Sequence, residues 1–338
     1  MNCGATVTVA GGGALGLCAA LALADAGCAV TVCDPEPQGQ ASTVAAGMLG
    51  PVFEAVLDAE AAEHFDVLLA ARDLWPAVEA RASVALDRAG AMAVGSPAWL
   101  AGVGAGLMRL GLHGIDLPSR TAQALAPGLS GEHALLVRED WRLEPGPALA
   151  ALRVAAEAAG VAFRSERVAE VGQADWLVVA TGADRGLSDV APELSRLTPI
   201  RGQIARYAGR PGSGVSVRGE GVYAVPGACG LAVGATMEPG RTDVAPDATA
   251  MAPLIAAGVA LFPDLAGERP SLAAGVRAAT PDGLPMVGFS RSPKVILATG
   301  ARRNGWLLAP LIGRVVCACV TGRDAGPYAR CFDPARFG

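Results

Sequence analysis

The sequence predicts an α/β fold in which a domain with a parallel sheet is interrupted twice by a domain built on an antiparallel sheet. Three observations lead to this prediction. A strand–glycine–helix–strand unit occupies residues 6–34, strand–helix alternation returns in the middle and at the end of the chain, and residues 201–236 hold three short apolar runs separated by turns. Strands that alternate with helices are typical of parallel sheets, whereas short, closely spaced strands are typical of antiparallel ones.

The expected elements follow from the apolar pattern and from the residues that break it. Residues 6–10 form a short buried strand, residues 14–26 a helix that stops at Gly27, and residues 28–33 a second strand that leads to Asp34. Residues 60–82 have the pattern of one long amphipathic helix. Further helices are expected at residues 97–110, 147–159, 246–262 and 307–321, and further strands at 161–164, 176–180, 201–207, 221–225, 231–236 and 295–298.

This order of elements predicts a discontinuous arrangement of two domains. Residues 1–82, 138–199 and 279–338 are expected to form the parallel-sheet domain, and residues 83–137 and 200–278 the inserted one. No linker-like run separates two consecutive halves, which is why we expect an insertion and not two domains in tandem.

Composition excludes several classes of partner. The 338 residues carry a formal net charge of −5 and no basic cluster, which argues against binding to nucleic acid or to an anionic membrane surface. The longest apolar runs stop at Asp25 and at Arg314, well short of the about 20 residues that a spanning helix needs, so no transmembrane segment is expected. The first residues lack the charged region of a signal peptide, which favours a cytoplasmic protein.

The eight cysteines do not have the spacing of a metal site. No C-x-x-C pair and no cysteine–histidine pair occurs, and several cysteines lie within apolar runs, as at Cys18 and Cys33. We therefore expect reduced thiols and no bound metal.

The segment after the first strand has the pattern of a dinucleotide-binding turn. Gly11, Gly13 and Gly16 form a G-x-G-x-x-G, and Ala14 and Leu15 open the helix whose N-terminus would face the phosphates. Asp34, at the end of the next strand, is placed to accept hydrogen bonds from ribose hydroxyls and would repel a 2′-phosphate. The unit predicts a dinucleotide other than NADP and leaves FAD and NAD open.

Three later segments add to this picture. Residues 41–51 are mostly small and have no amphipathic period, so their backbone can lie close to a flat ring. Residues 175–183 read as a buried strand that ends in a turn at Thr181 and Gly182. Residues 299–310 open the last helix, and the positive end of that helix would stabilise negative charge on a bound ring.

Together these motifs resemble the D-amino-acid oxidase family, most closely its glycine oxidase branch. The most specific matches are residues 41–51, 223–226, 233–237, 277–288 and 303–305, and the resemblance covers nearly the whole chain. It implies a GR2-type FAD-binding Rossmann-like domain with an inserted substrate domain built on an antiparallel β-sheet. It also implies non-covalent FAD, because the flavin-linking cysteine that some relatives carry near the position of Arg277 is missing here.

The same resemblance implies an activity. Family members deaminate glycine, another small amino acid or a secondary amine by hydride transfer from the α-carbon to flavin N5. Oxygen is then reduced to hydrogen peroxide, and the imine is hydrolysed or used for thiamine thiazole biosynthesis. The implied partners are a small amine and molecular oxygen, while the presence of a homo-oligomer stays open.

The resemblance implies roles only for those residues of this sequence that match the positions of family motifs. Arg277 matches the arginine that binds the substrate carboxylate, since a guanidinium fork fits a carboxylate; Tyr223, Met237 and Arg303 match pocket residues. The implied cofactor residues are Gly11, Gly13, Ala14, Leu15, Gly16, Asp34, Ser42, Thr43, Ala46, Gly47, Met48, Val168, Thr181, Gly182, Gly300, Arg303, Asn304, Gly305, Trp306 and Leu307. No catalytic acid or base is assigned.

The sequence also departs from the family pattern. Ala301 and Arg302 replace a histidine and an aromatic residue, Ala278 replaces a proline, and Val44 replaces a tryptophan. The exact amine is therefore open. So are two other readings: a D-amino-acid dehydrogenase of the same family that passes electrons to a quinone or carrier, and a nucleotide-binding sensor or assembly protein without turnover.

Overall fold

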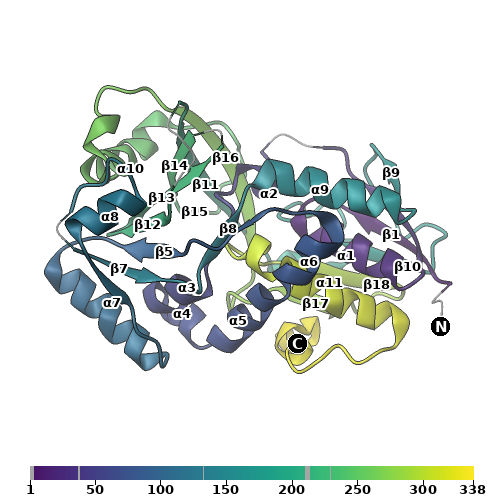
Figure 1. Ribbon diagram of the computed structural model, residues 1–338. Helices are drawn as coiled ribbons and strands as arrows, with labels where there is room; N and C mark the ends of the chain where they lie inside the picture. Colours follow the sequence, from purple (N-terminus) through teal and green to yellow (C-terminus); the bar gives the residue numbers. More distant parts are fainter. Residues whose placement is uncertain (1–3, 37–38, 132, 210–213, 229) are drawn as a thin grey trace.

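The computed structural model describes residues 4–36, 39–131, 133–209, 214–228 and 230–338. Two large sheets lie side by side, each covered by its own helices (Figure 1). The long strands β11 (Thr198–Tyr207) and β16 (Ser271–Ala279) belong to the mostly antiparallel sheet, in which β5 and β12 are the only parallel pair among the described residues, and they run on the side where it meets the other sheet. The cavities described below lie at this junction.

The first sheet has the order β17 (Met286–Phe289), β18 (Val295–Thr299), β10 (Trp176–Val179), β1 (Thr6–Ala10), β2 (Ala29–Cys33) and β9 (Ala162–Arg164). Its pairs are parallel except β17–β18. Alternate residues point to opposite faces: Val178 joins the core under the helices α1 (Ala14–Asp25), α9 (Pro145–Ala158) and α11 (Gly305–Thr321), whereas Leu177 and Val179 pack on the other side.

The second sheet has the order β15 (Glu238–Pro239), β11, β14 (Gly230–Gly234), β13 (Val222–Gly227), β12 (Ser216–Gly219), β5 (Ala91–Ala93), β7 (His133–Val137) and β6 (Ile115–Pro118), with β16 also paired to β11. The helices α8 (Ser119–Leu125) and α10 (Ala248–Leu261) contribute to the core on one face. The other face, near β11 to β12, is left open toward the first sheet and lines a cavity. A small third sheet joins β3 (Met48–Leu49), β8 (Trp141–Leu143) and β4 (Leu86–Asp87).

The predicted helix over residues 60–82 is wrong. The chain instead forms α4 (Ala59–Ala62), α5 (Phe65–Asp73) and α6 (Trp75–Ala82). Asp58 caps α4 by accepting from the amides of Glu60 and Ala61, and Pro76 lies in the first turn of α6. A proline lacks the amide that a continuous helix needs, which explains the break before α6.

Two other expectations need correction. Residues 41–51, expected as a loop, contain α2 (Ala41–Val44) and β3, and Pro51 begins α3 (Pro51–Leu57). The nine-residue strand β16 was not expected, because its run of alanine and glycine has no β-branched alternation beyond Val276. The helix α7 (Pro97–Arg109) and the unit from β1 to β2 lie within a residue or two of their predicted bounds.

The strands of the first sheet all come from the ranges expected for the parallel-sheet domain, but the domain bounds themselves stay a prediction. Within the described residues, no helix is both long and apolar enough to cross a membrane. The same part of the chain holds no cluster of three or more histidine, cysteine or acidic residues able to bind a metal ion. Cys3 and Cys229 lie outside the described residues.

Close packing of α1 on α11 yields a testable prediction. A Cβ added at Gly313 would lie 2.7 Å from the backbone oxygen of Cys18. We expect Gly313→Ala to lower the free energy of unfolding by about 1–3 kcal/mol, because backbone must shift to admit the methyl group. Gly102→Ala in α7 is the control, since nothing lies within 4 Å of the added Cβ there. Equal stability changes in the two variants, measured by urea denaturation, would contradict this account.

Candidate functional site

The turn between β1 and α1 is built so that backbone groups approach one another closely. A Cβ at Gly16 would lie 1.9 Å from the carbonyl oxygen of Gly11, and a Cβ at Gly11 would lie 2.5 Å from that of Ala180. Gly11 also has a φ of +107°, in the region that favours glycine. The glycines therefore let α1 start directly against β1 and β10, so the positive end of this helix lies at the turn.

Asp34 lies beside this turn at the end of β2. Its Oδ2 accepts hydrogen bonds from the Gly12 amide at 3.0 Å and from Gln40 Nε2 at 3.2 Å. From α2, Ser42 Oγ accepts from the Ala14 amide at 3.0 Å. A carboxylate and a hydroxyl are thus held at the start of α1.

A cavity of about 940 Å³ extends from this turn to Arg277 and the end of β18. The predicted cofactor residues that line it are Gly11, Gly13, Ala14, Leu15, Asp34, Ser42, Val168, Thr181, Gly182, Gly300 and Gly305. Its size is at the upper end for a ligand pocket, and one end of it is lined by the glycine turn, the start of α1 and Asp34. The residues present therefore fit a dinucleotide.

A second cavity of about 360 Å³ adjoins the first, and Ala41 and Arg277 line both. The predicted cofactor residues on its wall are Ala46, Gly47, Met48, Arg303, Asn304 and Trp306. The predicted substrate residues on its wall are Arg277, Tyr223, Met237 and Arg303. Three predicted cofactor residues line neither cavity: Gly16 packs on Gly11, Leu307 is in the core, and Thr43 faces a neighbouring hollow beside Leu149.

The pairing register explains how distant residues reach this second cavity. Arg277 lies opposite Ile200, Gly202 opposite Gly275, and Ile204 opposite both Ala273 and Gly234. Gly234 lies opposite Tyr223, which in turn lies opposite Arg218. Since directly opposite residues share a face and every second residue returns to it, Arg277, Tyr223 and Arg218 all lie on one face of the sheet.

Glycines on this face leave space for the long side chains of the neighbouring strands. A Cβ at Gly202 would lie 2.2 Å from Arg277 Nη1, and a Cβ at Gly234 would lie 2.7 Å from the Tyr223 hydroxyl. The Arg277 guanidinium therefore lies over β11, and the Tyr223 hydroxyl lies over β14.

Arg277 has no acidic partner among the described residues. Its Nη1 donates to the backbone oxygen of Thr236 at 3.2 Å and lies 3.2 Å from the Met237 sulfur. Burial lowers the pKa of Arg277, an effect that Tyr223 partly opposes, and burial raises the pKa of Tyr223. A cationic fork with unused donors thus faces the cavity, which is the arrangement that binds a carboxylate.

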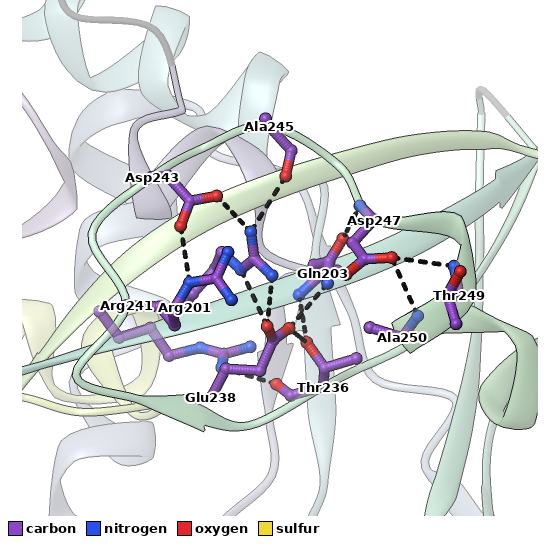
Figure 2. A network of polar contacts seen from close by, with 11 residues as sticks. Arg201, Gln203, Thr236, Glu238, Arg241, Asp243, Ala245, Asp247, Thr249 and Ala250 are labelled. Atoms are coloured by element: carbon purple, nitrogen blue, oxygen red, sulfur yellow. Dashed lines mark hydrogen bonds and ion pairs between the residues drawn. The ribbon is translucent and has the colours of Figure 1, made fainter.

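A polar network on the other side of β11 holds the segment that touches Arg277 (Figure 2). Arg201, 1% exposed, forms ion pairs with Glu238 and Asp243, and Gln203 Nε2 donates to Glu238 Oε1 at 2.7 Å. The Thr236 hydroxyl donates to the same carboxylate at 2.6 Å. Burial raises the pKa of Glu238, but these three donors outweigh it and lower the pKa to about 2. The network fixes Thr236 and, with it, a backbone contact of Arg277.

Arg303 lines the smaller cavity, but its guanidinium is already engaged. Its Nε donates to Glu54 Oε2 at 2.5 Å and its Nη2 to Asp58 Oδ2 at 2.5 Å. Burial lowers the pKa of Arg303, but the two carboxylates outweigh it and raise that pKa. A direct contact of Arg303 with substrate stays a prediction.

The start of α11 lies where the cavities meet. Gly305 lines the larger cavity, while Asn304 and Trp306 line the smaller one, so the positive helix end faces the junction. Trp306 Nε1 donates a hydrogen bond to the backbone oxygen of Ser42 at 3.0 Å. The ring centroids of Trp306 and Trp75 lie 6.1 Å apart. Pro310 lies inside the helix.

Two charged residues of the smaller cavity were not predicted from the sequence, Glu54 and Arg218. Both are buried and both line the smaller cavity. The available signal was an isolated charge in an apolar setting, Glu54 within α3 and Arg218 beside Val217 in β12. That signal marks many structural residues as well, so it did not single them out.

Known proteins share both the sequence and the fold. The family model described as FAD dependent oxidoreductase matches residues 6–319. Glycine oxidase of Pseudomonas aeruginosa is 33% identical over 165 residues, which is 46% of this chain and 45% of that protein. The bifunctional protein of tRNA 5-methylaminomethyl-2-thiouridine biosynthesis of Caulobacter vibrioides is 31% identical over 329 residues, covering 93% of this chain and 54% of that protein. These matches span about half the length of each relative.

Among solved structures, iminodiacetate oxidase from Chelativorans sp. BNC1 superposes with a TM-score of 0.86 at 21% identity, covering 97% of this chain and 98% of that one. At this identity the likeness concerns the fold alone. It confirms the predicted fold class.

The network around Glu238 makes stability depend on pH. Because the pKa of Glu238 is lowered from 4.5 to about 2 on folding, its contribution is present above pH 4.5 and is lost as the pH falls toward 2. We expect Glu238→Gln to lower the free energy of unfolding at pH 7 by about 1.5–3 kcal/mol and to flatten the acid dependence between those pH values.

Thermal unfolding at a series of pH values measures both effects. Glu170→Gln, at an exposed position, is the matched control and should leave the curve as in the parent protein. An unchanged acid slope in Glu238→Gln would refute the assignment.

Proposed function

The chain belongs to the DAO family of FAD-dependent oxidoreductases, and from this premise we propose that it oxidises the carbon–nitrogen bond of a small amino acid or secondary amine. The family makes it an enzyme that uses FAD. Glycine, sarcosine, D-alanine and iminodiacetate are the substrates to test first. We propose oxygen as the electron acceptor and non-covalent binding of FAD.

The larger cavity supports a placement of FAD along its length. The glycine turn and the start of α1 would hold the diphosphate, and Asp34 would accept from the ribose hydroxyls. The start of α11, with Gly305 on the cavity wall, would favour negative charge at the other end. The chemistry supplied by bound FAD is acceptance of a hydride from the substrate α-carbon.

The unpaired guanidinium of Arg277 is the single observation that carries the choice of substrate. It lies where the two cavities meet and has donors that no described carboxylate uses. A substrate carboxylate bound there in a bidentate fork would place its α-carbon at the junction. Tyr223, on the same face, adds a hydroxyl beside that carboxylate.

The side chains of the site would orient the substrate, and among the described residues no histidine lines either cavity. In the proposed reaction the amine first loses its proton to solvent, and the α-carbon then loses a hydride. The substrate becomes an imine, which water hydrolyses to a carbonyl compound and an amine or ammonia. Two electrons and two protons convert oxygen to hydrogen peroxide, so the reaction balances. Use of the imine for thiamine thiazole synthesis is a further part of the proposal.

A second candidate keeps the same half-reaction but passes the electrons to a quinone or carrier. One relative takes part in tRNA modification, by its name, but the net charge of −5 and the lack of a basic cluster argue against an RNA-borne amine here. Neither alternative changes the role proposed for Arg277.

Arg277 provides the first test of this function. We expect Arg277→Met to raise KM by about 100-fold or more, because two charge-assisted hydrogen bonds to the carboxylate are lost. Arg277→Lys keeps the charge without the fork and should recover only part of the affinity. Steady-state kinetics with glycine and sarcosine measure the effect, with bound FAD checked by its absorbance near 450 nm. A KM like that of the parent protein would remove Arg277 from the substrate site.

Anaerobic mixing provides the second test. We expect at least one of the four amines to bleach the 450 nm band, and air to restore it with release of hydrogen peroxide. A yellow protein that none of the amines bleaches would contradict the proposed function. Fast bleaching followed by slow recovery in air would replace the oxidase with the dehydrogenase.

A further inference from the structure

Besides Arg277 and Arg303, the smaller cavity is lined by an arginine to which the proposed reaction gives no role. Arg218 of β12 is only 8% exposed, and it lines this cavity together with Arg277. Its Nε is buried and has no hydrogen-bond partner in the part of the chain that the structure describes. A buried guanidinium with unused donors is costly unless an anion satisfies it.

The nearest carboxylates are committed elsewhere. Glu54 Oε1 forms a long ion pair with Arg218 Nη2 at 3.7 Å, which is beyond hydrogen-bond distance, while Glu54 Oε2 accepts a hydrogen bond from Arg303 at 2.5 Å. Asp140 accepts from the amides of Val52 and Phe53 at 2.8 and 3.1 Å and so caps the start of α3. Neither acid forms a hydrogen bond with Arg218.

The charge of the cavity wall leads to the same conclusion. Arg218, Arg277 and Arg303 line the wall with a single acid, Glu54, and behind the wall Asp140 interacts electrostatically with Arg218. Asp58 also binds Arg303 from outside the cavity wall. The two arginines left without a hydrogen-bonded acid are Arg218 and Arg277.

These two arginines are spaced for a short ligand. The Arg277 guanidinium lies over Gly202 of β11, and the Arg218 guanidinium carbon lies 5.8 Å from the Tyr223 ring of β13. β14 runs between β11 and β13, so these two strands lie two strand spacings, roughly 10 Å, apart in the sheet. A ligand with a carboxylate near each end and only a few atoms between them spans that gap.

We propose that the smaller cavity binds an amine with two carboxylates, one held by Arg277 next to the oxidised carbon and the other held by Arg218. The class comprises short dicarboxylic amino acids and N-carboxymethyl amines. This inference rests on the proposed function, since it names the substrate class of the same site. Arg218 acts by binding substrate and takes no part in proton or hydride transfer.

Two pairs of compounds that differ by one carboxylate test the proposal. Iminodiacetate is sarcosine with a carboxylate in place of one methyl hydrogen, and D-aspartate is related to D-alanine in the same way. With the FAD-loaded enzyme we expect kcat/KM to be about 10-fold to 100-fold higher for the dicarboxylate of each pair that is oxidised. A ratio of one or below would overturn the proposal.

Variants assign that preference to Arg218. Arg218→Met should bring the ratio of kcat/KM within each pair toward one, and Arg218→Lys should retain part of it, because the ammonium keeps the charge without the fork. Arg120→Met, at an exposed arginine of α8, is the matched control and should keep the parent ratio. An arginine that serves only the structure would lower both rates of a pair equally and leave the ratio unchanged, which would also overturn the proposal.

If Arg218→Met does not fold, Glu54→Gln tests the role of Arg218 in its place. Loss of the Glu54 charge removes the acid nearest to Arg218, so the preference for the dicarboxylate should rise by about threefold to tenfold. A preference that falls instead would overturn the inference.

Equilibrium binding separates this proposal from the proposed function. Succinate and propionate differ by the same carboxylate and contain no amine to oxidise, and their binding is read from the shift of the flavin spectrum. If succinate binds more tightly in an Arg218-dependent manner while no amine bleaches the flavin, the two-carboxylate site stands and the proposed function fails. If monocarboxylic amines are oxidised but neither assay shows a second-carboxylate preference, the proposed function stands and this inference fails.

Discussion

The arrangement of the site depends on one constraint: the charged guanidinium of Arg277 lies on a sheet face, and no described acid neutralises it. Arg277 can lie flat over β11 only because Gly202 has no side chain, and it is held by a backbone oxygen and a sulfur. Neither of these removes its charge. Such a guanidinium is poorly solvated until an anion binds, so the free energy of substrate binding includes the relief of that cost. The sheet register, the glycines and the network around Glu238 all serve this position.

Each of the two sheets contributes a different part of the site. The first sheet places backbone amides and Asp34 at the carboxyl ends of β1 and β2, where parallel strands leave a crevice for a nucleotide. The second sheet supplies a face on which Arg277, Tyr223 and Arg218 lie. The start of α11 closes the junction between them. Because Arg277 lies on both cavities, a ligand held by it is brought against whatever occupies the larger one.

Prediction from the sequence succeeded for elements whose bounds are set by interactions between residues close together in the chain. The unit from β1 to β2 was predicted to within a residue or two, since glycine geometry, apolar alternation and strand length are all local. The expected helix over residues 60–82 is interrupted before α6 because Pro76 lacks the amide that a continuous helix needs. The strand β16 was missed because alanine and glycine have little strand preference, and its nine residues are held by pairing with β11.

The sequence by itself determined the dinucleotide-binding turn, the order of the main elements and, through resemblance, the family and the choice of Arg277. Tertiary structure decided which charges remain unsatisfied. The resemblance assigned Arg303 to the site and did not single out Arg218, yet Glu54 and Asp58 bind Arg303 and no described acid forms a hydrogen bond with Arg218. The physical reason is that the state of a buried charge depends on partners brought close by strand pairing and helix packing, over separations of more than a hundred residues that no local pattern records.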